Sequence, residues 1–165
     1  MTDANDSTLT QAHYPPSLYE TDFYGWTQRT AKLLRDRDFD SVDWDNVIEE
    51  IETLGRSERA QLVNRLEVLL VHLLKWEYQS LCRRRSWELT IKEQRSRVER
   101  LLKENPSLRP YLNEAIAAAY EHAIYEAERQ TKLPYSVFPM SCPYLVAQIV
   151  DPEFPFNQND DQSPL

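Results

Sequence analysis

The chain has 165 residues and a formal net charge of -8, so it has the size of one ordinary domain and is acidic. This charge disfavours bulk attraction to nucleic acid or to an anionic membrane surface. Only two glycines occur, Gly25 and Gly55, and strands joined by tight turns usually need more. The composition therefore excludes a protein built from β-hairpins and predicts an all-α fold.

The first sixteen residues form a polar stretch that ends in Pro15 and Pro16. They lack the basic start and the apolar centre of a signal peptide, and no run of eighteen apolar residues follows anywhere in the chain. Cys82 and Cys142 have no CxxC or CxxH spacing, so neither a zinc site nor a disulfide framework is predicted. We expect a cytoplasmic protein with no membrane segment, no metal and no cofactor.

Charge is distributed unevenly along the chain. Residues 1–56 hold 5 basic and 12 acidic side chains, residues 57–110 hold 12 and 7, and residues 111–165 hold 2 and 8. The three stretches either neutralise one another when packed together, or the middle stretch forms a local anion site centred on Arg83, Arg84 and Arg85. We favour the first interpretation.

Residues 1–18 are predicted to form a flexible arm, and a first helix is predicted from Thr21. Asp43 is a suitable N-cap for a second helix, because its side chain can accept from a free backbone N–H. Gly55 is predicted to stop or bend this helix, and Ser57 to begin the next. The second helix should carry one apolar face, formed by Trp44, Val47, Ile48, Ile51 and Leu54.

The third helix is predicted to be long and apolar on most of its sides around residues 66–74. One of its apolar rows includes Leu66 and Leu69, and a second runs from Val63 to Leu81. Such a helix belongs at the centre of a bundle. The predicted fold is therefore a single-domain, all-α bundle of about five helices around a buried third helix.

A fourth helix is predicted with Ser86 as its N-cap, and a fifth after the break at "ENPSLRP" with Ser107 as its N-cap. The fifth carries a narrow row of small residues, which permits close helix packing. Beyond it, a segment rich in proline and aromatic residues should wrap the bundle and hold a short helix at about 143–150. The helical domain is assigned to residues 19–156 and a disordered tail to 157–165.

His72 is the most informative single position, because it lies inside the apolar run "VLLVHLLKW". Burial disfavours the charged imidazole unless a carbonyl or a carboxylate accepts its N–H. We expect a core histidine that binds a backbone carbonyl or a glutamate of the second helix. A general base, a metal ligand or a surface residue are the alternatives.

A site between the second, third and fourth helices is the main alternative to a purely structural bundle. Glu49, Glu50 and Glu52 lie close together, and a carboxylate beside His72 would raise the basicity of the imidazole. The candidate catalytic residues are these three glutamates and His72. The candidate ligand-binding residues are Trp76, Gln79, Arg83, Trp87, Gln94 and Arg95. The di-iron pattern of Glu-x-x-His pairs is missing, so no metal is expected.

No nucleophile motif or phosphate-binding glycine loop occurs, so the sequence leaves open whether the chain is an enzyme. The arginines of residues 83–100, with Trp87 among them, could clamp a nucleic acid, but the acidic flanks argue against high affinity. We rank three hypotheses. A helical protein-interaction or regulatory module comes first, with a protein partner or self-association. An enzyme or small anionic-ligand binder comes second, and a weak nucleic-acid binder third.

Several segments together resemble the domain-of-unknown-function family twenty-nine, which is uncharacterised and mainly cyanobacterial. They are "YETDFYGWTQRTAKLLR", "DWDNVIEEIETLGRSERAQL", "VLLVHLLKWEYQ", "RRRSWELTIKEQRSRV", "NPSLRPYL" and "FPMSCPYLVAQIVDPEF". The resemblance covers about residues 19–156. It implies a compact, mainly helical bacterial protein and supplies no catalytic residues. Many of its motif positions are polar, which favours a site near the third and fourth helices.

Overall fold

The structure, a computed structural model, describes residues 17–156, and all of its regular elements are helices. The α-helices are α1 (Leu18–Thr21), α2 (Phe23–Asp36), α3 (Trp44–Tyr78), α4 (Arg85–Glu104), α5 (Leu112–Thr131) and α6 (Val146–Val150). Short 3-10 helices span Phe39–Ser41, Ser80–Cys82, Pro106–Tyr111 and Tyr135–Val137. No strand occurs within 17–156, which confirms the all-α prediction. The arm up to residue 16 and the tail from residue 157 lie outside the described residues.

The chain divides into two compact units, Met1–Thr53 and Leu54–Leu165. The N-terminal unit contains α1, α2 and the first ten residues of α3, and the C-terminal unit contains the remainder of α3 with α4, α5 and α6.

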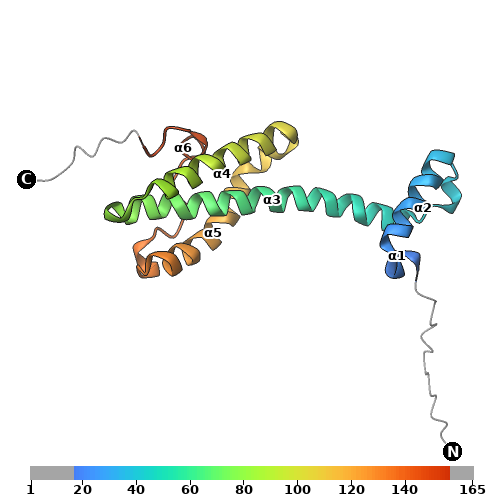
Figure 1. The fold of residues 1–165 in the computed structure, drawn as a ribbon, viewed down its shortest axis with the longest axis horizontal. Helices are drawn as coiled ribbons and strands as arrows, with labels where there is room; N and C mark the ends of the chain where they lie inside the picture. The colour runs from blue at the N-terminus through green and yellow to red at the C-terminus, as the bar shows by residue number, and fades with distance from the viewer. Residues whose placement is uncertain (1–16, 157–165) are drawn as a thin grey trace, which may run out of the picture. The chain divides into compact units, whose positions relative to one another are not determined.

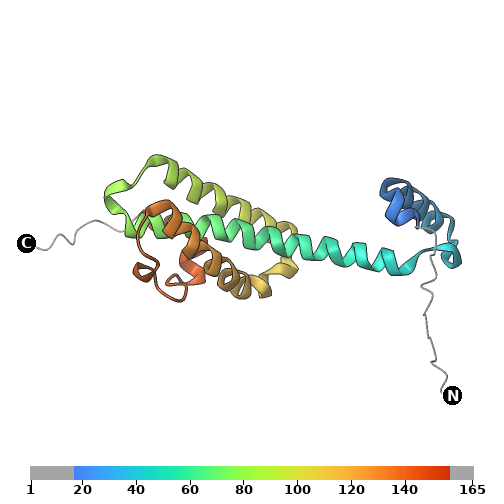
Figure 2. The ribbon, with the colours of Figure 1, turned by 90° about the horizontal axis from the view of Figure 1, so that it is seen from below.

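The C-terminal unit is a three-helix core in which α4 and α5 pack along α3 (Figures 1 and 2). The leucines that α3 contributes are almost fully buried: Leu62, Leu66, Leu69, Leu70, Leu73 and Leu74 are at most 1% exposed. On α5, Ala115, Ala119, Ala123 and Ala127 are 0% exposed, so the predicted small-residue row does permit close packing. The predicted central, buried third helix is confirmed for this part of α3.

The segment after α5 packs against the bundle through buried apolar and hydroxyl groups. Phe138, Tyr144 and Ile149 are at most 8% exposed. The Tyr144 hydroxyl donates to Glu77 of α3 at 2.6 Å, and burial raises the pKa of this phenol strongly. The Tyr120 hydroxyl of α5 donates to the Pro139 carbonyl at 2.9 Å. The segment is therefore part of the folded unit, as predicted, and contains the short helix α6.

The N-terminal unit is small and buries few side chains. Within its described part, residues 17–53, the buried residues are Trp26, Thr30 and Val42. Helices α2 and α3 begin after aspartates: Asp22 accepts from the Gly25 N–H at 2.9 Å, and Asp43 accepts from the backbone N–H that follows it by three residues at 3.4 Å. The prediction of Asp43 as an N-cap is confirmed.

The predicted second and third helices are one helix, α3, and this corrects the prediction of a stop at Gly55. A glycine inside a helix costs only about 1 kcal/mol relative to alanine, and strong helix formers follow Gly55 on its C-terminal side. Leu81 is fully exposed rather than part of an apolar row, because α3 ends at Tyr78. The predicted N-caps Ser86 and Ser107 are also wrong: α4 begins at Arg85 and α5 at Leu112.

Replacement of Gly55 by alanine should stabilise α3. Gly55 has no left-handed backbone, and a Cβ added there would meet nothing within 4 Å, so alanine fits without strain. We expect Gly55→Ala to stabilise the protein by up to about 1 kcal/mol, through the lower entropy of the unfolded chain. Urea unfolding followed by circular dichroism measures this. Gly25→Ala is the control that should not stabilise the protein, because its Cβ would clash with a carboxylate oxygen of Asp22.

Candidate functional site

The imidazole of His72 is half-buried on α3 and bound to its own helix. Its Nδ1 lies 2.8 Å from the Val68 carbonyl, and a carbonyl only accepts, so Nδ1 carries the proton and donates it. This is the backbone-carbonyl partner that we predicted. Burial lowers the pKa of His72 below its ordinary value, the hydrogen bond to Val68 raises it, and the nearby charge of Lys75 lowers it.

His72 should make the fold sensitive to acid. Because burial lowers its pKa in the folded state, the unfolded chain takes up a proton first as the pH falls below about 6.5. The stability due to neutral His72 is therefore present above this pH and is lost as the pH falls through the folded pKa. We expect His72→Gln to flatten the dependence of unfolding free energy on pH between about 7 and 5. A wild-type dependence that is already flat over this range, or one that His72→Gln leaves unchanged, would contradict this expectation.

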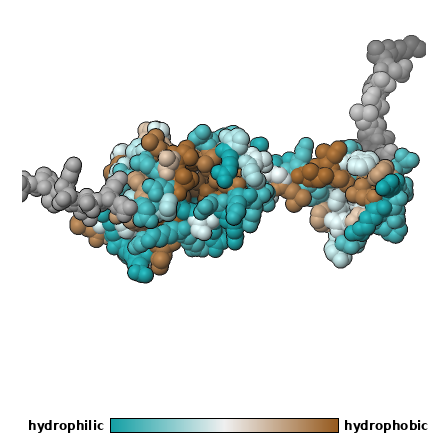
Figure 3. All heavy atoms as spheres, turned by 90° about the horizontal axis from the view of Figure 1, so that it is seen from above, coloured by the Kyte–Doolittle hydropathy of each residue, from teal (hydrophilic) through white to brown (hydrophobic). Residues whose placement is uncertain are grey.

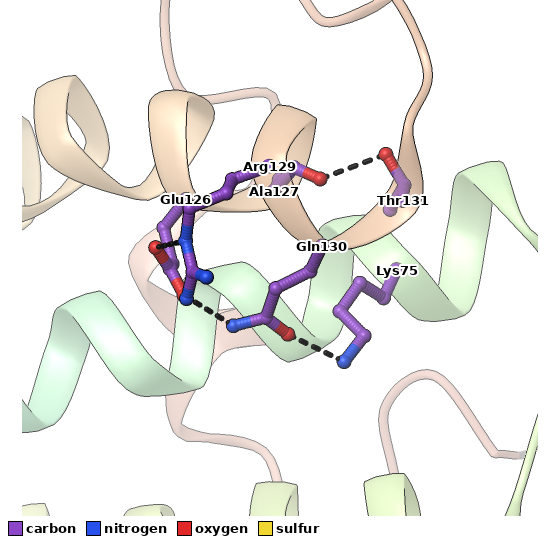
Figure 4. A network of polar contacts seen from close by, with 6 residues as sticks. All are labelled: Lys75, Glu126, Ala127, Arg129, Gln130 and Thr131. Atoms are coloured by element: carbon purple, nitrogen blue, oxygen red, sulfur yellow. Dashed lines mark hydrogen bonds and ion pairs between the residues drawn. The ribbon is translucent and has the colours of Figure 1, made fainter.

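Next to His72 on α3, Lys75 is a buried cation held by uncharged groups. The Lys75 side chain is 8% exposed, and its Nζ donates to Gln130 of α5 at 2.7 Å (Figure 4). The same Nζ lies 4.5 Å from the centre of the Trp87 ring of α4. Burial lowers its pKa, and so does the neighbouring Arg84. Among the described residues no carboxylate pairs with this ammonium group. Lys75 therefore ties the three core helices together.

Glu126 of α5 belongs to the same network of polar contacts as Lys75 (Figure 4). Its carboxylate accepts from Arg129 at 2.5 Å and from the Gln130 amide at 2.5 Å, and these hydrogen bonds lower the pKa of Glu126 to about 2. The Gln130 amide thus bridges an acid and a buried cation. Its orientation is fixed by both partners.

Aromatic rings and cations alternate at the same end of the C-terminal unit. Arg83 lies over the Trp76 ring at 5.2 Å, and its Nε donates to the Trp76 carbonyl at 2.9 Å. The Trp76 ring also meets the Phe156 ring edge to face, with their centres 5.1 Å apart. The Lys92 ammonium lies 5.0 Å from the centre of the Phe156 ring. Trp87 is buried between Lys75 and Arg84. These contacts are cation–π interactions, which typically contribute about 0.5–2 kcal/mol each.

Gln79 also lies at this end, where its amide donates to the Thr131 carbonyl at 2.9 Å. Four predicted ligand-binding residues are therefore gathered by the fold: Trp76, Gln79, Arg83 and Trp87. Their rings and donors contact protein groups. The prediction that they bind a ligand stays a prediction.

The other two predicted ligand-binding residues, Gln94 and Arg95, are buried on α4. Arg95 donates to three backbone carbonyls of the C-terminal segment: Nε to Ile149 at 2.8 Å, one terminal nitrogen to Gln148 at 3.1 Å, and the other to Phe154. Burial lowers the pKa of Arg95 to about 10, so the side chain remains charged at neutral pH. The carbonyl oxygen of Gln94 has no hydrogen-bond partner among the described residues. Arg95 thus fixes the segment around α6.

A groove of about 610 Å³ lies between α4, α6 and the start of α5. Its lining is mainly apolar, and Figure 3 shows such apolar surface between hydrophilic side chains. The apolar lining residues are Leu69, Val98, Leu102, Leu112, Val146, Ile149, Val150 and Pro152. Lys92, Glu99 and Arg109 are exposed charged residues in the lining. The sequence pattern did not predict this groove, because α6 and the surface of α4 come together only in the folded chain.

The predicted catalytic glutamates belong to the N-terminal unit, whereas His72 belongs to the C-terminal unit. Glu50 accepts from the Tyr19 hydroxyl at 2.5 Å, and this hydrogen bond raises the pKa of Tyr19 to about 12. Glu49 and Glu52 are exposed. A joint Glu/His site therefore stays a prediction, and no group of three His, Cys, Asp or Glu side chains that could hold a metal occurs within residues 17–156.

Apolar side chains lie next to these glutamates on the surface of α3. Trp44, Ile48 and Ile51 are 46%, 53% and 63% exposed, and their spacing of four and three residues aligns them on one face. We call these three residues the apolar row. The sequence predicted these three residues on one apolar face, together with Val47 and Leu54. Within residues 17–53 of the N-terminal unit, no helix buries the apolar row.

The family of the chain follows from a match that covers nearly the whole helical region. Residues 18–155 match Domain of unknown function DUF29. The chain belongs to the DUF29 family. This confirms the resemblance inferred from the sequence segments. Neither a curated protein nor a solved structure matches the chain.

No described helix of this DUF29 protein combines the length and the apolar character that a crossing of the bilayer needs. Of the arginines predicted to contact nucleic acid, Arg84, Arg85 and Arg100 are exposed and Arg95 is buried. Arg97 pairs with Glu93 at 2.7 Å. Part of the positive charge is therefore neutralised locally, and nucleic-acid binding stays the weakest of the three hypotheses.

Proposed function

We propose that this DUF29 protein is a protein-interaction module without catalysis of its own, and that it binds through the N-terminal unit. The observation that carries the proposal is the exposed apolar row on α3. Large apolar side chains elsewhere in the unit are exposed as well: Phe23 is 50% and Tyr24 is 73% exposed. Exposed apolar surface of this kind typically marks an interaction site.

The small core of the unit supports the same proposal. In its described part, residues 17–53, only Trp26, Thr30 and Val42 are buried. The indole Nε1 of buried Trp26 has no hydrogen-bond partner among the described residues. A buried donor without an acceptor costs about 1–3 kcal/mol, and a partner surface would remove part of this cost or offset it.

Site-specific photo-crosslinking tests the proposal. A photoreactive residue at Ile51 should give a discrete protein adduct in cells that produce this protein naturally, and Ile48→Lys should abolish the adduct. The same photoreactive residue at exposed Gln28 of α2 is the matched control and should give none. No adduct at Ile51, or equal adducts at both positions, would contradict the proposal.

A further inference from the structure

The apolar row has a regular acidic neighbour. Asp45, Glu49 and Glu52 each follow one member of the apolar row by one position, so they form a parallel row beside it on α3. All three are exposed. Helix α3 therefore presents an apolar row with an acidic flank. An amphipathic helix that docks by residues at four- and three-residue spacing typically fits an apolar groove with cations at its edge.

The groove of the C-terminal unit has these complementary properties. Its floor is apolar, and its volume of about 610 Å³ admits several side chains. Arg109 is exposed in its lining and has no partner among the described residues, and Lys92 of the same lining pairs with Glu88 at 2.5 Å. Glu99 is the one acidic residue of the lining. Residues 85–110, which supply much of the wall, hold seven basic and four acidic side chains.

We propose that a second copy of the chain is the partner, and that the apolar row of each copy docks into the groove of the other. This inference depends on the proposed function and names its partner. Two such contacts related by a two-fold axis close the assembly as a dimer, whereas a single one-way contact would continue into an open chain. The reciprocal arrangement also doubles the area that one contact buries, toward the 1,200–2,000 Å² that is typical of a stable interface.

Charge disfavours the simpler alternative, in which the two apolar rows pack against each other. Residues 17–53 hold ten acidic and four basic side chains, so a contact between two N-terminal units would bring like charges together. Like charges across an interface oppose association, whereas an acidic row against a basic groove edge favours it. The groove is therefore the better match for the row.

Light scattering on the full chain after size exclusion tests the proposal. The wild type should have twice the mass of the 19.5 kDa chain. Ile48→Lys/Ile51→Lys, which places cations in the row, and Ser96→Glu/Val150→Glu, which places acids in the groove, should each raise the dissociation constant at least about tenfold. Gln28→Lys and Leu89→Glu change exposed positions outside both surfaces, and they should leave the dimer unchanged.

Mixing the two double variants gives the sharpest result. The mixture contains one intact row and one intact groove, so it should form a heterodimer although neither variant dimerises alone. Packing of row against row predicts the reverse, since the groove variant would still dimerise by itself, and that result overturns the proposal. A monomeric wild type also overturns it. The crosslinking experiment tests the proposed function separately from the dimer. The proposed function fails if Ile51 gives no crosslink, and it survives if Ile51 crosslinks to a different protein.

Discussion

Leu66→Ala is expected to destabilise the protein by about 3–4 kcal/mol, the largest effect that we predict for a single apolar side chain. Leu66 is 0% exposed in the part of α3 that α4 and α5 cover. The substitution removes buried methyl groups and leaves a cavity that rigid neighbours fill only in part. For a chain of this size, the melting temperature should fall by about 10 °C. Urea unfolding followed by circular dichroism gives the free energy directly.

Leu54→Ala provides a matched control on the same helix. Leu54 is 68% exposed, so the same chemical change should alter the unfolding free energy by less than about 0.5 kcal/mol. Equal losses for the two variants would contradict the assignment of the core. They would mean that α3 is buried equally along its length.

Arg95→Ala is expected to release the C-terminal segment and to cost about 3 kcal/mol or more. The guanidinium donates to three backbone carbonyls, of Gln148, Ile149 and Phe154, and hydrogen bonds from a charged donor typically contribute about 1.5–3 kcal/mol each. Without it, these carbonyls would need other donors. Limited proteolysis should then cut near α6 in the variant well before the wild type, and urea unfolding should show the lower stability.

Two further variants separate the geometry of Arg95 from its charge. Arg95→Lys keeps the charge but lacks the planar fork of five donors, so it should recover less than half of the lost stability. Arg97→Ala removes an exposed arginine of α4 whose partner is Glu93, and it should cost less than about 1 kcal/mol. If Arg95→Ala unfolds like the wild type, the three hydrogen bonds do not hold the segment.

The helices of the C-terminal unit could be predicted because their apolar spacing agrees with their burial. The run around His72 is apolar on most sides, and α3 is surrounded by α4 and α5 there. The small residues of α5 likewise predicted close packing. The residue types that typically begin or end a helix predicted the helix ends less reliably. Gly55 lies inside a helix because its cost is small beside the stability of the turns on both sides.

The partners of polar side chains could not be predicted from spacing. Gln94 and Arg95 seemed suited to a ligand, but the carbonyls that bind Arg95 lie more than fifty residues later in the chain. Their position depends on how the proline-rich segment folds back. The same holds for the groove, whose walls come from distant segments. By contrast, a backbone carbonyl was one of the two partners predicted for His72, a glutamate being the other, because a half-buried imidazole needs a nearby acceptor and the helix supplies one.

The exposed face of α3 shows a further limit of sequence patterns. The spacing of Trp44, Ile48 and Ile51 predicts one apolar face, but the pattern is the same whether the face meets the chain's own core or a partner. Only the exposed fractions of these side chains distinguish the two cases. An apolar helix face predicted from the sequence therefore indicates an interface with a partner as well as it indicates a contact with the core.

Hydrogen–deuterium exchange along α3, measured at low and high protein concentration, tests the central claim most directly. We expect the backbone amides of residues 66–74 to be strongly protected from exchange at both concentrations, because their hydrogen bonds open only when the C-terminal unit unfolds. Amides of residues 44–52 should exchange rapidly in dilute solution and become protected as the concentration rises. Protection of residues 44–52 that is already complete in dilute solution, or that is unchanged by concentration, would contradict it.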